Sequence, residues 1–212
     1  MTDFTLNKGG DCRYYDNFLS PELCFYLTKE LLNQVNWVTE TISSYGKDNI
    51  SPRVTSSMFD LMCPTPSVKK YWKEDADWVK AGTRGWTPLM GYVKDHIQKS
   101  FGVKIWYAQM NHYRTGEDYI GFHSDKEMQE SDIVFSISLG NKRRFGFRSK
   151  ELNSGNFEKE LYLSNGSLIM FDYNAGKNNY KHSLPKIRKK DLQDHSHSFG
   201  RINITFRTMN EN

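Results

Sequence analysis

Two side chains able to bind a metal ion stand two positions apart in the segment GFHSDKE, residues 121–127. Side chains at i and i+2 of an extended chain project from the same side, so His123 and Asp125 could reach one ion together. A second histidine would complete a two-histidine, one-carboxylate set with three open coordination positions, which suits non-haem Fe(II). The HxD pattern alone is weak, because most chance copies lie in solvated loops. Its meaning depends on a third ligand.

His182 is the best third ligand. It follows the apolar segment GSLIMFDY and lies 57 residues after Asp125, a separation that could bring it back across a barrel. The other four histidines favour structural or solvated roles. His96 falls in a predicted helix, and His112 faces away from the hydrogen-bonding residues of its predicted strand. His195 and His197 fall in a polar loop.

The elements that must position these ligands can be read from periodicity. After Gly102, four segments alternate with period two and predict strands: KIWYAQMNHY, DIVFSISL, GSLIMFDY and RINITFR. Short strands without intervening helices favour an antiparallel sandwich or barrel. Two helices, opened by Ser20–Pro21 and Thr87–Pro88, are expected to cover one outer face. Residues 38–86 are mixed and rich in turn formers, so no strands are assigned there.

The strand RINITFR separates its side chains by type, with a polar face formed by Arg201, Asn203, Thr205 and Arg207. A polar face in water is the simplest explanation for any single strand. The alternative is an open barrel in which two arginines line a small anionic pocket, since a planar guanidinium binds a carboxylate with two hydrogen bonds. KIWYAQMNHY likewise places Asn111 and Tyr113 on one face.

Four ordered segments, NHYRTGEDYIGFHSDKE, SLGNKRRFGFR, GSLIMFDY…HSLP and RINITFR, together resemble the AlkB family of Fe(II)- and 2-oxoglutarate-dependent dioxygenases. The nearest resemblance is to its eukaryotic DNA and RNA dealkylation-repair branch, from about residue 36 to the C-terminus. It implies a mainly β, α+β fold, the double-stranded β-helix or jelly roll, with N-terminal helices packed on one outer face. It also implies a single domain over 1–212, with an N-terminal extension and helix (1–35), a nucleotide-recognition region (38–86) and a jelly-roll core (103–207).

The same resemblance implies a set of site residues. The iron ligands would be His123, Asp125 and His182. Five residues would bind the co-substrate 2-oxoglutarate. Arg201 and Tyr113 would hold its distal carboxylate, Arg207 and Asn111 would lie near its iron-chelating end, and Asn203 would support the site.

The implied reaction is oxidative demethylation of N-alkylated bases, such as 1-methyladenine and 3-methylcytosine, in DNA or RNA. It uses Fe(II), O2 and 2-oxoglutarate and releases formaldehyde, succinate and CO2. The target base must leave its stack. Tyr45 stands where relatives carry a residue that fills the resulting gap, although a loop-tip residue is an equally good interpretation. Arg53 and Glu127 resemble base-pocket residues, while Lys126 replaces a usual acidic residue and leaves base selectivity open.

Composition is compatible with this function. The chain has 212 residues and a formal net charge of +4. Basic runs at 142–150 and 186–190 could follow phosphates, although such runs are more often solvated faces. The cysteines form no CxxC pair, and no apolar run reaches membrane-spanning length. We therefore expect an intracellular protein of the nucleus or cytoplasm, monomeric and without a membrane partner.

Two other functions stay open. The same iron chemistry could act on a protein side chain or a small molecule, or the fold could bind nucleic acid without catalysis. An assay on methylated oligonucleotides separates the first of these from nucleic-acid demethylation. Binding of nucleic acid without iron and without turnover would indicate the second. A purely structural jelly roll would give no reason for inward-facing polar residues.

Overall fold

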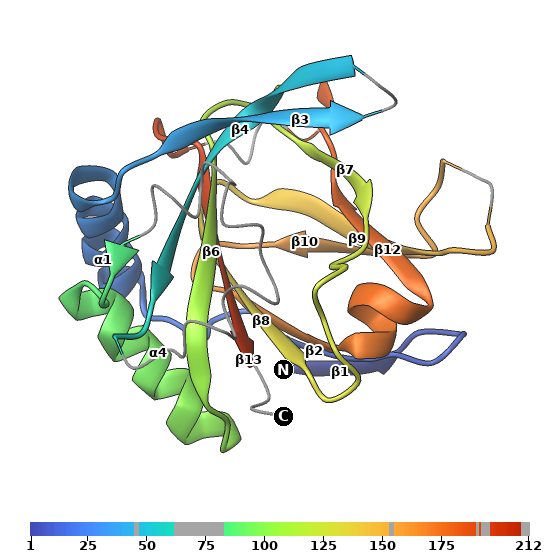
Figure 1. Ribbon diagram of the computed structural model, residues 1–212, viewed down its shortest axis with the longest axis horizontal. Coiled ribbons are helices and arrows are strands. Elements are labelled where there is room, and N and C mark those ends of the chain that lie inside the picture. Colours follow the sequence, from blue (N-terminus) through green and yellow to red (C-terminus); the bar gives the residue numbers. More distant parts are fainter. Residues whose placement is uncertain (45–46, 62–82, 153–154, 190, 192–195, 209–212) are drawn as a thin grey trace.

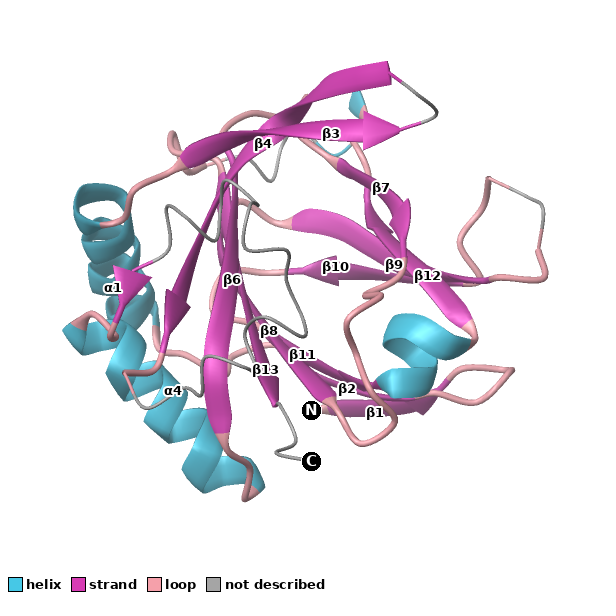
Figure 2. Cartoon of the chain, in the orientation of Figure 1, coloured by secondary structure: helices cyan, strands magenta, loops and turns pink. Residues whose placement is uncertain are grey.

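A computed structural model describes residues 1–44, 47–61, 83–152, 155–189, 191 and 196–208. Two β-sheets enclose the centre of the molecule, and two long helices lie on one outer side (Figures 1 and 2). Within the described residues, no helix is long and apolar enough to cross a membrane.

The larger sheet has the strand order β1-β2-β11-β8-β13-β6-β4-β3, with β5 paired to β4. Neighbouring strands run antiparallel, apart from the parallel β4–β5 pair. The bounds are β1 Thr2–Thr5, β2 Asp11–Tyr15, β3 Val38–Ser44, β4 Lys47–Phe59, β5 Thr83–Arg84, β6 Ile105–Tyr113, β8 Ile133–Gly140, β11 Leu168–Asp172 and β13 Arg201–Thr208.

The smaller sheet has the order β10-β9-β12-β7. Its strands are β7 Ile120–His123, β9 Arg143–Ser149, β10 Lys159–Leu163 and β12 Tyr180–Leu184. From β6 to β9, and again from β10 to β13, successive strands alternate between the two sheets. This alternation is the connectivity of a jelly roll, so the predicted fold class is confirmed.

The two predicted helices are α1 (Pro21–Gln34) and α4 (Pro88–Phe101). Ser20 caps α1 by accepting from the Leu23 amide at 3.2 Å, and Gly102 ends α4 with φ 66°. Both helices pack on the outer face of the larger sheet, where one apolar cluster joins residues of α1, α4, β6, β8 and β13 (Figure 1). The predicted cap Thr87 makes no side-chain capping bond.

The start of α4 is capped from outside instead. The carboxylate of Glu30, on α1, accepts from the amides of Leu89 and Met90 at 3.2 and 3.3 Å. A negative charge at a helix N-terminus is favourable because it meets unpaired N–H groups and the positive end of the helix dipole. This contact also fixes α1 against α4.

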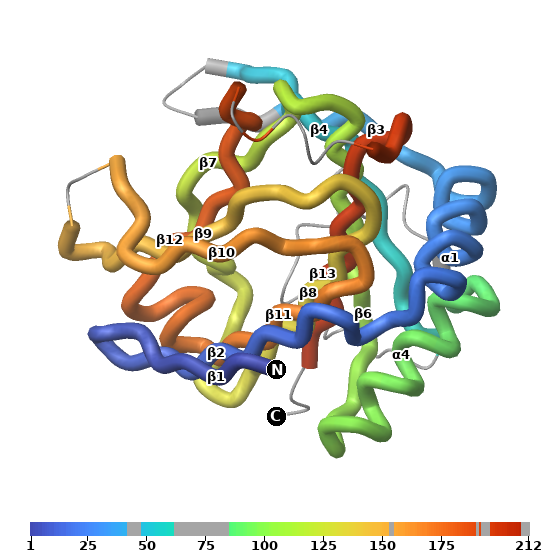
Figure 3. The backbone as a smooth tube through the Cα atoms, turned by 180° about the vertical axis from the view of Figure 1, so that it is seen from behind, coloured from blue at the N-terminus to red at the C-terminus, as the bar shows by residue number. Residues whose placement is uncertain are grey.

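Two hairpins outside the predicted elements extend the larger sheet. The β3–β4 hairpin extends the larger sheet through β6, where Val54 pairs with His112. The β1–β2 hairpin extends its other edge through β11 (Figure 3). A short π-helix, η1 (Asn174–Asn178), lies between β11 and β12.

Candidate metal centre and anion pocket

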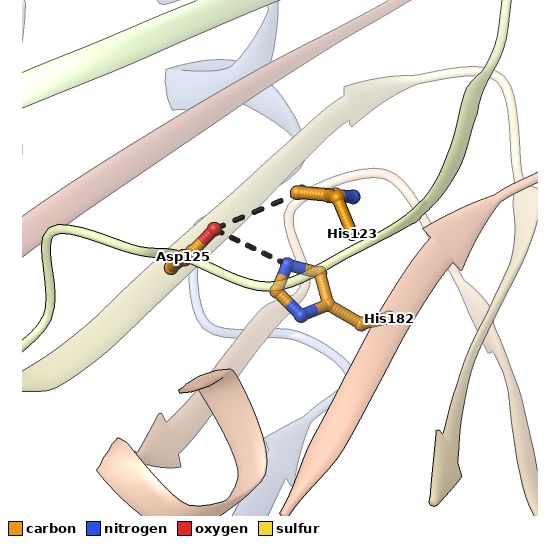
Figure 4. Close-up of side chains that lie close together, drawn as sticks. All are labelled: His123, Asp125 and His182. Atoms are coloured by element: carbon orange, nitrogen blue, oxygen red, sulfur yellow. Dashed lines mark ion pairs between the residues drawn. The ribbon is translucent and has the colours of Figure 1, made fainter. Parts of the chain in front are cut away.

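The three predicted ligands converge at one end of the smaller sheet. The register of β7 and β12 places His123 directly opposite His182, and their ring centroids are 4.3 Å apart. Asp125 follows β7, and its amide donates to the Gly176 carbonyl at 3.0 Å. Its Oδ1 lies 3.7 Å from His123 Nε2 and 3.5 Å from His182 Nε2 (Figure 4). The three side chains thus face one point.

The chemistry of this donor set fits a transition-metal ion. One ligand atom from each side chain lies within 4.8 Å of the other two, close enough for a single ion to bridge all three. Asp125 and His182 are buried, and His123 is half-buried. Two imidazoles and one carboxylate leave open coordination positions and suit non-haem Fe(II).

The electrostatics keep two of the candidate ligands, Asp125 and His123, in their metal-binding forms. Although burial alone would raise it, the pKa of Asp125 is held well below its ordinary value by the Arg207 guanidinium and by the two imidazoles. Burial, and then the charge of His182, lower the pKa of His123 to about 3. These two changes favour an ionised Asp125 beside a neutral His123 imidazole, which are the forms of these side chains that bind a cation.

A cavity of about 180 Å³ extends from the triad between the two sheets. The polar face of β13 lines it, side by side with the corresponding face of the neighbouring strand β6. Their register pairs Arg201 with Tyr113, Asn203 with Asn111 and Arg207 with Tyr107. The inward-facing polar surface is therefore present, and the simpler explanation of a polar face in water is wrong for this strand.

Arg201 is the cavity residue most in need of an anion. Its side chain is 1% exposed, and its Nη2 donates to Ser138 Oγ at 2.8 Å. Its Nε and Nη1 find no hydrogen-bond partner among the described residues. Burial, only partly offset by Tyr113, lowers its pKa to about 10, so it stays protonated at neutral pH. A buried guanidinium with unpaired donors is costly unless an anion binds there.

Arg207, at the opposite end of the polar face, is occupied by protein carboxylates. Its Nη2 lies 3.0 Å from Asp125 Oδ2, and its Nη1 contacts Glu127. Asp125 therefore turns one oxygen to Arg207 and the other to the two imidazoles. The structure thus places Arg207 beside the candidate metal centre, where its ion pair with Asp125 engages the oxygen that faces away from the imidazoles.

Two of the other predicted residues, Arg53 and Asn203, line the same cavity. Arg53 is buried in the same cavity and donates from Nε to Asn111 Oδ1 at 2.6 Å. Asn203 donates to Ser136 Oγ at 2.7 Å and to the Ile137 carbonyl at 3.0 Å, which fixes its side chain. Tyr45 lies outside the described residues.

The sequence reasoning missed two serines that position this face. Ser136 and Ser138, on β8, accept from Asn203 and Arg201 respectively. They are alternate residues of the predicted strand DIVFSISL, otherwise apolar after its first residue, so their period-two spacing was a usable signal for inward polar groups.

The basic run at 142–150 does not form one surface. Arg143 is buried and donates to three backbone carbonyls, those of Thr115 at 3.3 Å and of Asp118 and Pro185 at 2.8 Å. Arg144 lies on the other side of β9 and pairs with Glu160 at 3.2 Å. An assignment of Arg143 to a phosphate-binding surface is therefore wrong, because its guanidinium fixes loops near the anion pocket.

Replacing Arg143 with methionine should lower the free energy of unfolding by about 3 kcal/mol, because three carbonyl acceptors lose a charged donor. Arg144→Met is the matched control on the same strand, and loss of its partly exposed ion pair should cost less than about 1 kcal/mol. Denaturant unfolding of both variants measures the difference. Equal losses would contradict the structural role given to Arg143.

Comparisons with known proteins agree with this geometry. The family model of the 2OG-Fe(II) oxygenase superfamily matches residues 11–207. The DNA oxidative demethylase ALKBH2 of Homo sapiens is 33% identical over 129 residues, which cover 58% of this chain and 46% of the relative. The Arabidopsis thaliana protein of that name is 24% identical over 226 residues, covering 95% of this chain and 67% of the relative.

The chain spans about half the length of the mammalian relatives. The solved structure of OsALKBH1 superposes with a TM-score of 0.60 at 16% sequence identity. The match covers 93% of this chain and 97% of that one, and it supports the jelly-roll fold. The resemblance to AlkB-type proteins is thus confirmed, and family membership implies Fe(II), 2-oxoglutarate and O2. The chain belongs to the 2OG-Fe(II) oxygenase superfamily.

Proposed function

We propose that this protein is an Fe(II)- and 2-oxoglutarate-dependent dioxygenase that removes methyl groups from N-alkylated bases in DNA. The observation that carries the proposal is the pairing of two features in one cavity. A His–Asp–His triad lies at one end, and a buried guanidinium with two unpartnered donors, that of Arg201, lies in the same cavity. A small dicarboxylate that also binds iron would satisfy both.

Each part of the cavity has a role in this proposal. His123, Asp125 and His182 would hold the metal. Fe(II), with 2-oxoglutarate and O2, supplies the oxidising power that hydroxylates an N-methyl group, and formaldehyde, succinate and CO2 are the products. Arg201, beside Tyr113, would hold the distal carboxylate and so orient the co-substrate.

Three side chains beside the triad support the productive geometry. Arg207 would keep Asp125 ionised and oriented, and Asn203 would brace the polar face through Ser136. Asn111, fixed by Arg53, would border the chelating end of the co-substrate. These bonds leave little freedom in the cavity, which favours accurate placement of the methyl group.

DNA is the proposed substrate because relatives that match this chain bear the name DNA oxidative demethylase. RNA is the second candidate. The base would enter between Arg53 and Glu127, which both line the cavity. Region 38–86, including Tyr45, would recognise the nucleotide. We further propose that the protein acts as a monomer where nucleic acid is found, in the nucleus or cytoplasm.

The test is mass spectrometry of short oligonucleotides that carry 1-methyladenine or 3-methylcytosine, as single- and double-stranded DNA and RNA. Each is incubated with Fe(II), ascorbate and 2-oxoglutarate, and each component is omitted in turn. We expect the loss of one methyl mass from DNA, dependent on Fe(II) and 2-oxoglutarate. The matched control is the same DNA without the methyl group.

The other outcomes discriminate between the alternatives. Succinate formed slowly without loss of the methyl mass would contradict the nucleic-acid substrate and favour a protein or small-molecule substrate. Oligonucleotide binding without iron and without any turnover would instead indicate a catalytically silent binding module.

A further inference from the structure

The loop that carries the carboxylate ligand rests on the π-helix η1, an element with no assigned role. This loop, Ser124–Met128, contains Asp125 and Glu127. The Asp125 amide donates to the Gly176 carbonyl of η1 at 3.0 Å. π-Helical turns are rare and often occur at functional sites.

Lys177 of η1 makes the second contact with this loop. Its Nζ donates to the Met128 carbonyl at 2.6 Å, and its charge lies 5.5 Å from the centre of the Tyr173 ring. The Met128 amide in turn donates to the Asp125 carbonyl at 3.0 Å. The loop is thus held at both Asp125 and Met128 by consecutive residues of η1.

Packing between the two elements is tight. A Cβ on Gly176 would lie 2.5 Å from Met128 Sδ and 3.0 Å from the Phe171 ring, so a larger residue here would have to displace the Met128 side chain. Among the described contacts, the half-buried Lys177 is the one residue of η1 whose polar side chain reaches across to the loop.

We propose that Lys177 is a positioning residue for the metal centre, holding the Ser124–Met128 loop so that the Asp125 carboxylate stays aimed at the two imidazoles. The inference rests on the metal site of the proposed function. Groups that orient metal ligands in this indirect way typically change metal affinity about 10- to 100-fold when removed.

The experiment measures Mn(II) binding to metal-free protein in the presence of 2-oxoglutarate, from the loss of the free Mn(II) signal in electron paramagnetic resonance. Lys177→Met keeps the apolar stem and removes the donor, and we expect its Kd for Mn(II) to rise at least about tenfold. Lys177→Arg retains a cationic donor and should stay within about threefold of the wild type.

Lys159→Met is the matched control. Lys159 is also half-buried and also lies over an aromatic ring, that of Phe4 at 4.8 Å, but it belongs to β10 at the other edge of the sheet. Its replacement should leave Mn(II) affinity unchanged. Thermal unfolding without metal verifies that each variant is folded, and Lys177→Gln, with the same expected loss, replaces Lys177→Met if the latter does not fold.

The outcomes distinguish failure of the proposed metal site from failure of the proposed role of Lys177. Wild-type protein that takes up no Mn(II) would remove the metal site and this inference with it. Wild-type binding together with unchanged affinity in Lys177→Met, or with equal losses in Lys177→Met and Lys159→Met, would overturn the positioning role alone.

Discussion

Asp125→Ala should reduce demethylation of a methylated oligonucleotide by more than about 1,000-fold, which corresponds to about 4 kcal/mol of activation free energy. The carboxylate is the only anionic ligand of the triad, and its Oδ1 faces both imidazoles. His182→Ala should act similarly, because it removes the other buried ligand of the site. Product is measured by the loss of the methyl mass.

The protein should remain folded in both variants. Removing one member of a buried ion pair is usually costly, but Arg207 keeps Glu127 as a second counter-charge when Asp125 is lost. Asp60→Ala is the matched control, since this carboxylate pairs with Lys94 and accepts from Trp86 on the helix-bearing side of the larger sheet. It should retain turnover. Full activity in Asp125→Ala or His182→Ala would refute the ligand assignment.

Local signals in the sequence were enough for the helices and for four strands. Ser20 marks the start of α1 and Gly102 the end of α4, and such helix ends depend only on residues nearby in the sequence. The alternation of apolar residues predicts β6, β8, β11 and β13. The β3–β4 hairpin carries no such signal. Ser56, Ser57 and Thr55 are fully buried in β4, so its place in the sheet depends on pairing with β6 rather than on apolar alternation.

The convergence of the three candidate ligands could be predicted for a related reason. His123 and Asp125 are sequence neighbours, and the long separation from His182 is closed by the register of β12 against β7. Arg143 shows the limit of this reasoning. Its run of basic neighbours gives no information about which side of β9 each residue faces, and only the strand register shows that its guanidinium is buried.

The contacts of Arg207 and η1 could not be predicted because they join distant segments. Arg207 meets Asp125 across the space between the two sheets, and Gly176 approaches the same residue from a π-helix. Neither contact follows from residue spacing. Together with the bond from Lys177 Nζ to the Met128 carbonyl, they show that this carboxylate and its loop are held by two separate parts of the chain, β13 and η1.

Arg201→Ala should raise the apparent KM for 2-oxoglutarate about 100-fold, equivalent to about 2.7 kcal/mol, because truncating one partner of a buried charged hydrogen-bond pair costs about 2–5 kcal/mol. Two of its donors find no partner among the described residues, so their binding capacity is free for the co-substrate. Saturating 2-oxoglutarate should restore part of the turnover, since the metal ligands are unchanged. Succinate release against 2-oxoglutarate concentration measures both quantities.

The same variant should leave affinity for methylated DNA within about twofold, because the Arg201 side chain is 1% exposed and does not reach the surface. Arg201→Lys separates charge from shape: it keeps the cation but loses the planar fork, so its KM should fall between those of the wild type and Arg201→Ala. Arg148→Ala is the control, because it removes an arginine outside the polar face of β13; in the wild type this guanidinium lies 3.9 Å from the centre of the Phe122 ring. Its KM for 2-oxoglutarate should stay that of the wild type. An unchanged 2-oxoglutarate requirement in Arg201→Ala would exclude this residue from the co-substrate site and leave its unpartnered donors without an explanation.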